Sequence, residues 1–81
     1  MKYWVYVIKS LRWNYVYVGM TDNIERRLSQ YNNGYSRTTK SYAPFILILS
    51  EAFADRRTAR IREKQLKSGF GREYVKLLKN S

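Results

Sequence analysis

The hydrophobic positions of this chain gather in short runs that predict strands and helices in a definite order. Residues 2–9 and 15–19 are rich in Tyr, Val, Trp and Ile, which pack well on the pleated surface of a strand. A short polar connection over residues 10–14 separates the two runs, so together they predict an antiparallel hairpin. Tyr6 and Tyr17 could approach each other across this hairpin.

A helical pattern follows the hairpin. Positions 21–23 carry Thr, Asp and Asn, which favour the start of a helix, and apolar side chains then recur on one face. The recurring apolar positions are Ile24, Leu28 and Tyr31. This pattern predicts a helix from about Asn23 to Asn32. Arg27 lies along the edge of its buried face, between Ile24 and Tyr31.

The second half of the chain begins with a polar stretch. Residues 35–44 are polar and basic and end at Pro44, which predicts a loop. The unbroken apolar run Phe45–Ser50 is typical of a strand covered on both faces, so we expect it to be the central strand of a three-stranded sheet. Residues 55–68 have helical composition with Gly69 just past their end, and a last helix is expected from about Arg72 to Lys79.

These elements predict a single small domain of the α+β (mixed α/β) class over residues 1–81. Its expected architecture is a three-stranded antiparallel sheet flanked by helices, in the order ββαβαα. A chain of 81 residues has enough apolar side chains for one core only, and its 44% hydrophobic content is that of a folded domain. A second domain within this sequence is therefore not expected.

The charge balance points to a polyanionic partner. Sixteen Lys and Arg residues against six Asp and Glu residues give a net charge of +10. Each phosphate neutralised by such a protein releases condensed counterions, which adds affinity independent of sequence. Nucleic acid is the expected partner. Ribosomal RNA, an anionic membrane surface, or a role limited to solubility are the alternatives that charge alone leaves open.

The chain contains no Cys and no His, which narrows its chemistry. Disulfides, zinc sites of the usual kind and histidine general bases are thereby excluded. The longest apolar run, Phe45–Leu49, is too short to span a bilayer, and no signal-peptide core follows the first residues. We therefore expect a cytoplasmic protein in which any catalysis depends on other groups.

Glu63 is an acidic residue on the apolar stripe of the second predicted helix. The stripe consists of Ala59, Leu66 and Phe70, and Ile61 lies off it. Burying a carboxylate costs several kcal/mol unless a cation or hydrogen-bond donors meet it, so this position needs a divalent metal or an arginine as partner. An ordinary interpretation is a glutamate at the rim of the core that pairs with a nearby cation. The candidate cations are Arg27, Arg60 and Lys67.

Tyr6, Tyr17 and Arg27 also have ordinary interpretations. The chain has eight tyrosines, and aromatic residues in strands usually serve packing. An arginine on a helix is often solvated or contacts a phosphate. Each of these residues alone would not predict an active site.

Taken together, the same residues resemble the GIY-YIG nuclease superfamily, from Tyr3 to about Arg72. Trp4-Val5-Tyr6 corresponds to the Gly-Ile-Tyr motif and Tyr17-Val18-Gly19 to the Tyr-Ile-Gly motif, at the separation typical of the family. Three further positions match the family's arginine, its His or Tyr position and its metal-holding glutamate: Arg27, Tyr31 and Glu63. The chain is similar to small single-domain members, such as the N-terminal domain of excision-repair incision nucleases.

The resemblance implies metal-dependent hydrolysis of phosphodiester bonds. Glu63 would hold one Mg²⁺ or Mn²⁺, which neutralises the scissile phosphate and stabilises the leaving oxygen. Tyr6 would take the proton of the attacking water, and Tyr17 would help to place that water or the phosphate. Because a free tyrosine has a pKa of about 10, it needs activation by a cation, the metal or a relay such as Tyr31. Arg27 would hold the phosphate and stabilise the transition state.

Two positions depart from the family's pattern, and several basic residues are candidates for substrate contact. Trp4 replaces a glycine, which could narrow the groove beside Tyr6 or stack on a base, and Met20 stands where some relatives carry a basic or small polar residue. The residues expected to contact nucleic acid are Arg26, Arg37 and Lys40, near the first helix and the loop after it.

Two functional classes follow from these observations. The first is an endonuclease that cuts DNA, with RNA as the other polymer to test, with low sequence specificity and a role in repair or recombination. The second is a non-catalytic basic module that binds nucleic acid or acts as an adaptor on the nuclease scaffold. Since no separate DNA-binding domain is expected, a partner protein would supply targeting. A homodimer is the other assembly to consider, because cutting both strands with one small active site is simplest with two copies.

Overall fold

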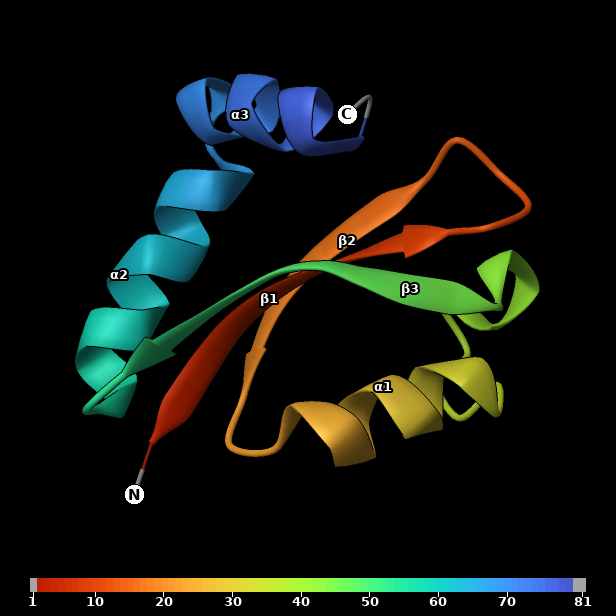
Figure 1. The fold of residues 1–81 in the computed structure, drawn as a ribbon, viewed down its shortest axis with the longest axis horizontal. Helices are drawn as coiled ribbons and strands as arrows, with labels where there is room; N and C mark the ends of the chain where they lie inside the picture. Colours follow the sequence, from red (N-terminus) through yellow and green to blue (C-terminus); the bar gives the residue numbers. More distant parts are fainter. Residues whose placement is uncertain (1, 80–81) are drawn as a thin grey trace.

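The elements follow the predicted order along the chain. The structure is a computed structural model and describes residues 2–79, except for the side chains of Phe70 and Lys79. Its order is ββαβαα with one short 3₁₀ helix added, η1, before the third strand (Figure 1). A three-stranded antiparallel sheet carries helices on both faces. The predicted α+β class and architecture are therefore confirmed.

The predicted hairpin consists of β1 (Tyr3–Ser10) and β2 (Val16–Thr21). Its register pairs Tyr6 with Gly19 and Ile8 with Tyr17. Opposed residues of an antiparallel pair share a face, so Tyr6 and Tyr17 are diagonal neighbours on the same side of the sheet. The predicted approach of the two tyrosines across the hairpin is thus confirmed.

The order of the strands corrects one prediction. The apolar run of β3 (Phe45–Phe53) predicts a central strand, but β1 is central and β3 is an edge strand, in the order β2-β1-β3. β1 pairs along both of its edges, and Val5, Val7 and Ile8 are buried on its two faces. β3 pairs with β1 alone. Apolar composition shows how much surface a strand can bury, whereas its place in the sheet depends on which neighbours supply hydrogen bonds.

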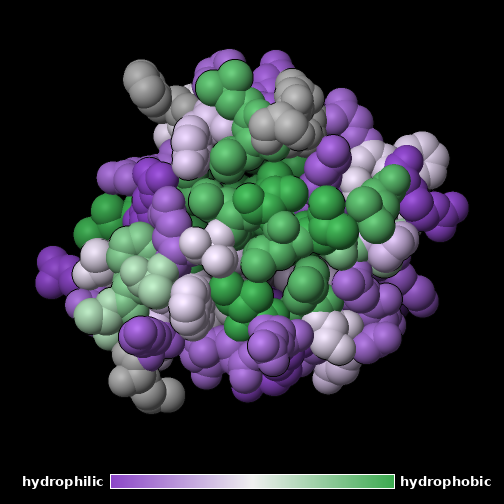
Figure 2. Space-filling model, in the orientation of Figure 1, coloured by the Kyte–Doolittle hydropathy of each residue, from purple (hydrophilic) through white to green (hydrophobic). Residues whose placement is uncertain are grey.

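Part of β3 contributes to an apolar surface. Ile46 is 42% exposed and Leu47 is 37% exposed, and Leu77 of the last helix is exposed as well. Figure 2 shows apolar side chains gathered across the middle of this side of the molecule, with polar side chains around them. An edge strand with exposed apolar residues is prone to pair with another chain, but the homodimer expected from the sequence stays a prediction. Among residues 2–79, no helix is long and apolar enough to cross a membrane.

The first helix, α1 (Ile24–Asn32), lies against the face of the sheet that carries Tyr6. Asn23 caps it, since its side-chain oxygen accepts a hydrogen bond of 2.9 Å from the N–H of Arg26. The apolar stripe predicted for this helix packs there with Tyr6 and Ile8 in one cluster. Gly34, at φ 70°, turns the chain after the helix.

The end of α1 also sets the start of β3. The side-chain amide of Asn32 accepts a hydrogen bond of 2.6 Å from the N–H of Phe45 and donates one of 3.3 Å to its carbonyl. The predicted loop between them contains η1 (Lys40–Tyr42). These two hydrogen bonds fix the start of β3 next to the end of α1, so that β3 pairs with the edge of β1 that β2 does not occupy.

The second helix, α2 (Arg56–Lys67), covers the opposite face of the sheet. Asp55 caps it through a hydrogen bond of 2.8 Å from the N–H of Thr58. Ala59 and Leu66 are buried in the core cluster on this face, and Ile61 is exposed, so the predicted stripe is confirmed at these positions. The place predicted for Phe70 on the stripe lies outside the described side chains.

The last helix, α3 (Gly69–Lys79), begins three residues before its predicted start at Arg72. Ser68 ends α2 and starts α3, because its hydroxyl accepts from the N–H of Gly71 and its carbonyl from the N–H of Arg72. A Cβ at Gly71 would overlap the backbone of Gln65 and Leu66. Gly71 therefore permits the close packing of α3 on the end of α2.

Candidate active site

Tyr6 lies in the centre of the sheet with its phenol over the neighbouring strand. A Cβ at Gly19, directly opposite in β2, would overlap the phenol of Tyr6. Tyr6 itself is only 3% exposed. The glycine of the Tyr17-Val18-Gly19 motif is therefore required by the close approach of Tyr6 to the β2 backbone.

Tyr31, in the last turn of α1, meets Tyr6 beneath the helix. The two phenol oxygens lie 2.9 Å apart and share a hydrogen bond in which either group is able to donate. Burial, and then the interactions with Tyr6 and Tyr17, raise the pKa of Tyr31 well above its ordinary value. Tyr31 is therefore a neutral phenol at physiological pH and can donate a hydrogen bond to the oxygen of Tyr6.

Arg27 joins this pair from the side of α1. Its guanidinium carbon lies 5.0 Å from the centre of the Tyr31 ring, and its Nη1 donates a hydrogen bond of 3.0 Å to Oε1 of Gln30. Hydrogen bonding with Tyr6 is the main cause that raises the pKa of Arg27. The structure thus brings together Tyr6, Arg27 and Tyr31.

Tyr17 connects this cluster to the second helix. Its ring centre lies 5.6 Å from that of Tyr31, and the Nζ of Lys67 lies 5.7 Å from the Tyr17 ring centre. Lys67 belongs to α2, which covers the opposite face of the sheet. Its side chain therefore reaches Tyr17 around the outer edge of β2, which no other strand among residues 2–79 covers.

Glu63 lies one helical turn before Lys67. Its side chain is 14% exposed, and its carboxylate oxygens lie 3.5 Å from Nε of Arg60 and 3.4 Å from Nζ of Lys67. Two of the three cations considered in the ordinary interpretation are therefore its partners, whereas the described residues include no ion pair between Glu63 and Arg27. Through Lys67 the carboxylate is linked to Tyr17.

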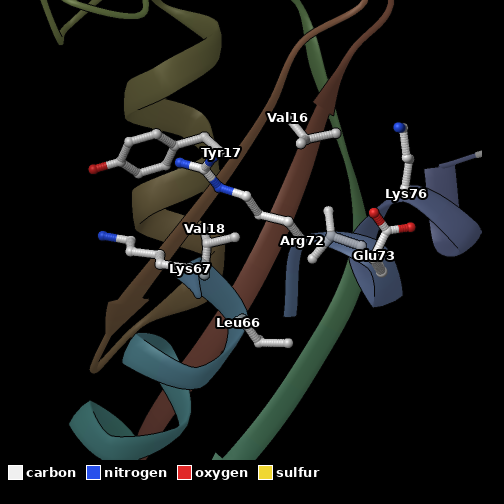
Figure 3. Close-up of a pocket in the computed structure, with 9 residues that line it drawn as sticks. Val16, Tyr17, Val18, Leu66, Lys67, Arg72, Glu73 and Lys76 are labelled. Carbon is white, nitrogen blue, oxygen red and sulfur yellow. The ribbon is translucent and has the colours of Figure 1, made fainter. Parts of the chain in front are cut away.

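Two open cavities follow one another along the outer edge of β2. The first, of about 530 Å³, includes Tyr17, Val18 and Lys67 in its lining (Figure 3). The second, of about 450 Å³, includes Met20, Arg27 and Arg56. Gly19 lies between the two sets of residues on β2, and Glu63 lies between Arg56 and Lys67 on α2. Along the sequence, Gly19 and Glu63 thus fall between residues that line the first cavity and residues that line the second.

The three residues expected to contact nucleic acid lie in different places. Arg26 lines the second cavity and pairs with Asp22 at 2.6 Å. Arg37 is exposed in the loop after α1, and Lys40 opens η1 with its aliphatic chain close to Gly34. Neither Arg37 nor Lys40 lines the two cavities along β2. Of the three residues, Arg26 is therefore the one that lines the same cavity as Arg27.

One residue at the site, Gln30, received no role from the sequence, and Lys67 was considered there only as an ion-pair partner of Glu63. Gln30 holds the guanidinium of Arg27, and Lys67 lies between Glu63 and Tyr17. Gln30 lies three positions after Arg27 on the same helix, and this spacing is the signal that could have identified it. The contact of Lys67 with Tyr17 depends on the packing of α2 and has no such signal.

The residues present fit a divalent cation bound mainly by substrate and water. Within residues 2–79, no group of three or more His, Cys, Asp or Glu side chains could enclose a metal ion. Mg²⁺ commonly uses one or two carboxylates together with water and phosphate oxygens, and Glu63 offers one such carboxylate. The side chains of Arg60 and Lys67 are about half exposed, so they are free to move aside when a cation competes for Glu63.

Comparisons with known proteins agree with this arrangement. Residues 2–76 match the GIY-YIG catalytic domain. The chain is 31% identical over 78 residues to a UPF0213 protein of Staphylococcus haemolyticus, a match that covers 95% of this chain and 94% of that protein. It is 34% identical over 65 residues to a UPF0213 protein of Clostridium perfringens, a match that covers 79% of this chain and 69% of that protein.

A solved structure has a similar fold. The solution NMR structure of a UPF0213 protein from Bacillus halodurans aligns with a TM-score of 0.56 and 27% sequence identity, over 98% of this chain and 86% of that one. The chain therefore belongs to the GIY-YIG family of nucleases, and the resemblance inferred from its motifs is confirmed. Membership of this family implies a nucleic-acid substrate.

Proposed function

We propose that this protein is a metal-dependent endonuclease that hydrolyses phosphodiester bonds in DNA at the outer edge of β2. The observation that carries the proposal is a continuous series of contacts between the site residues on the α1 side of the sheet and those on the α2 side. Tyr6, Tyr31 and Arg27 lie on the α1 side, and Tyr17 joins them through Lys67 to Glu63 on the α2 side. Residues from both motifs, from α1 and from α2 are therefore linked by contacts that run from Tyr6 on the central strand to the outer edge of β2.

Arg27 binds the scissile phosphate in this proposal. Its guanidinium is oriented by Gln30 and lines a cavity that also contains Arg26 and Arg56. A planar guanidinium offers two parallel N–H groups to phosphate oxygens and cannot lose its proton. Arg27 is thus suited to stabilise the additional negative charge of the pentavalent transition state.

Tyr17, in its phenolate form, accepts the proton of the attacking water and becomes a neutral phenol. It is partly exposed and lines an open cavity, and the ammonium group of Lys67 lies beside its ring, 5.7 Å from the ring centre. This assignment differs from the one implied by the resemblance, because Tyr6 is 3% exposed and already bonded to Tyr31. Tyr6 orients Arg27 and fills the space beside Gly19.

The reaction forms a bond from the water oxygen to phosphorus and breaks the bond from phosphorus to the leaving oxygen. Glu63 would hold Mg²⁺ or Mn²⁺, which when bound acts as a Lewis acid that offsets charge on the phosphate and on the leaving oxygen. The net charge of +10 attracts DNA independently of sequence, which agrees with low specificity and with targeting by a partner in repair or recombination.

Cleavage assays with Glu63→Gln test the proposal. Supercoiled plasmid and labelled branched, single-stranded and RNA substrates are incubated with Mg²⁺, Mn²⁺ or EDTA. Wild type should cut only with metal, and Glu63→Gln should lose at least about 100-fold in turnover, since even groups that merely orient a metal ligand contribute about 10- to 100-fold. The matched control is Glu25→Gln, at an exposed glutamate outside both cavities, which should cut like wild type.

One observation supports a second candidate function, a non-catalytic basic module that binds nucleic acid or acts as an adaptor. Glu63 already pairs with Arg60 and Lys67, which is how a purely structural carboxylate would be satisfied. Tight, salt-sensitive binding of DNA by wild type without metal-dependent cutting of any substrate would favour this module over the nuclease. Full activity of Glu63→Gln would exclude the proposed metal site.

A further inference from the structure

The cavity beside Tyr17 continues away from the proposed catalytic centre, between β2 and the last helix. Its far end is lined by residues of α3, and Figure 3 shows the side chain of Arg72 extending across it toward Tyr17. We call this part of the site the β2–α3 groove. Its lining comprises Val16, Tyr17, Val18, Leu66, Lys67, Arg72, Glu73, Val75 and Lys76.

The floor and the rim of the β2–α3 groove differ in chemistry. Val18, Leu66 and Val75 are buried apolar side chains at its floor. The charged members of the lining, Lys67, Arg72, Glu73 and Lys76, are all exposed. Three cations against one carboxylate make the rim electropositive, while the floor offers apolar surface and the ring of Tyr17.

Two of the rim cations lack a salt bridge within the part of the chain that the structure describes. Among residues 2–79, neither Arg72 nor Lys76 forms a salt bridge, whereas Lys67 pairs with Glu63. Arg72 and Lys76 are four positions apart on α3 and therefore lie on the same side of this helix. Cations without a salt bridge that lie on one side of a helix over an apolar floor favour a ligand that carries both negative charge and an apolar surface.

We propose that the β2–α3 groove holds an unpaired nucleotide of the substrate strand next to the scissile phosphate. Arg72 and Lys76 bind backbone phosphates, and the base lies on the apolar floor beside Tyr17. Grooves that bind single strands commonly combine a cationic path for the backbone with an aromatic ring on which a base stacks. The inference rests on the proposed nuclease function and adds its substrate class, which is DNA with a single-stranded segment.

The size of the groove supports one nucleotide over a duplex. Its volume of about 530 Å³ falls within the range of about 300–1,000 Å³ typical of pockets for small ligands. A base that remains paired and stacked keeps its faces covered and cannot reach the floor. The apolar surface therefore adds affinity for unpaired nucleotides alone. Rim cations without this floor would bind the phosphates of single-stranded and duplex DNA alike.

Binding assays in EDTA separate this inference from catalysis. Anisotropy of a labelled single-stranded oligonucleotide and of its duplex is measured over a range of salt for wild type and for Arg72→Ala/Lys76→Ala. The double variant should lose single-strand affinity preferentially. The slope of log K against log salt should fall in magnitude by about 1.4, since each phosphate contact to a single strand contributes about 0.7. The control Arg57→Ala/Lys64→Ala removes two exposed cations of α2 that line neither cavity.

A second variant tests the floor without a change of charge. Val16→Trp introduces bulk at the mouth of the groove and should weaken single-strand binding about tenfold, with an unchanged salt slope and an unchanged duplex affinity. Thermal melts followed by circular dichroism verify that each variant is folded.

The possible results distinguish the inference from the function on which it rests. If Arg72→Ala/Lys76→Ala lost affinity equally for single strand and duplex, or if the control pair lost the same affinity, the proposed role of the groove would be overturned. This would hold even if wild type cuts DNA. If wild type binds single strands through Arg72 and Lys76 as expected but never cuts DNA, the nuclease proposal fails while the inference about the groove is retained. Unaltered single-strand affinity in Val16→Trp would show that the base does not lie on the apolar floor.

Discussion

The phenol oxygens of Tyr6 and Tyr31 lie 2.9 Å apart in the interior, although 25 positions separate the residues in the sequence. One comes from the central strand and the other from the last turn of α1. Their hydrogen bond therefore ties the position of α1 to the sheet. Because Arg27 lies on the same helix and contacts both phenols, the bond also sets where the guanidinium lies.

Tyr31→Phe removes this bond and retains the ring. We expect a loss of about 0.5–1.5 kcal/mol in the free energy of unfolding, because the buried hydroxyl of Tyr6 loses this hydrogen bond and retains only its interaction with Arg27. Turnover should fall as well, since Arg27 loses part of its support. Urea denaturation followed by circular dichroism measures the first effect. Tyr35→Phe, at an exposed tyrosine, is the control, and equal stability of the two variants would contradict the prediction.

Arg27→Lys retains the positive charge and loses the planar pair of donors. Turnover should fall on the order of 100-fold, the usual effect of losing one donor to a transition-state oxygen, while the affinity for DNA in EDTA changes little. Single-turnover cleavage and anisotropy measure the two quantities. Arg57→Lys, at an exposed arginine that lines neither cavity, should remain active. Unchanged turnover in Arg27→Lys would argue against a paired contact with the phosphate.

Gly19→Ala tests the close approach of Tyr6 to β2. The added methyl group would overlap the phenol of Tyr6, so the ring must move, with a cost of about 1–3 kcal/mol in stability and a marked loss of activity. Gly69→Ala is a matched control, because nothing lies within 4 Å of a Cβ at that position. Thermal melts and cleavage rates compare the two. Wild-type behaviour of Gly19→Ala would show that the space beside the phenol is not limiting.

Stability should fall as the pH rises above about 10. In the unfolded chain Tyr31 ionises near its ordinary pKa of about 10, whereas burial raises its pKa in the folded protein. The folded state then retains a proton that the unfolded state releases, so the contribution of Tyr31 is complete below about pH 10 and is lost above it. Urea melts between pH 8 and 11 should show a steeper loss for Tyr35→Phe than for Tyr31→Phe, and parallel curves would contradict the assignment.

The secondary structure follows closely from local signals in the sequence. Asn23 and Asp55 cap the helices that they were expected to start, and the stripes through Tyr31 and Leu66 face the core. These features depend on neighbours within a few positions, which the sequence displays directly. The predicted start of α3 was wrong: Ser68 caps the helix within the turn that ends α2, a local signal that the sequence also contains, whereas the close packing at Gly71 depends on both helices.

The candidate site was recognised from the order of its motifs, but its geometry was not. The sequence lines up Tyr6, Tyr17, Arg27 and Glu63, yet it does not show that Tyr6 is buried and Tyr17 accessible. It also does not show that Lys67 passes around the edge of β2. These facts depend on contacts between elements distant in sequence.

Local pattern is thus sufficient to define the elements of this protein, their caps, the pairing of the first two strands and the family to which the motifs belong. The order of the strands, the exposure of each phenol and the groove beside α3 arise only when the elements pack. The apolar run of Phe45–Leu49 has the same composition at the centre or the edge of a sheet, and its place was decided by β1, which hydrogen-bonds on both sides. Burial and charge pairing depend on contacts between packed elements, so no single segment of the sequence specifies them.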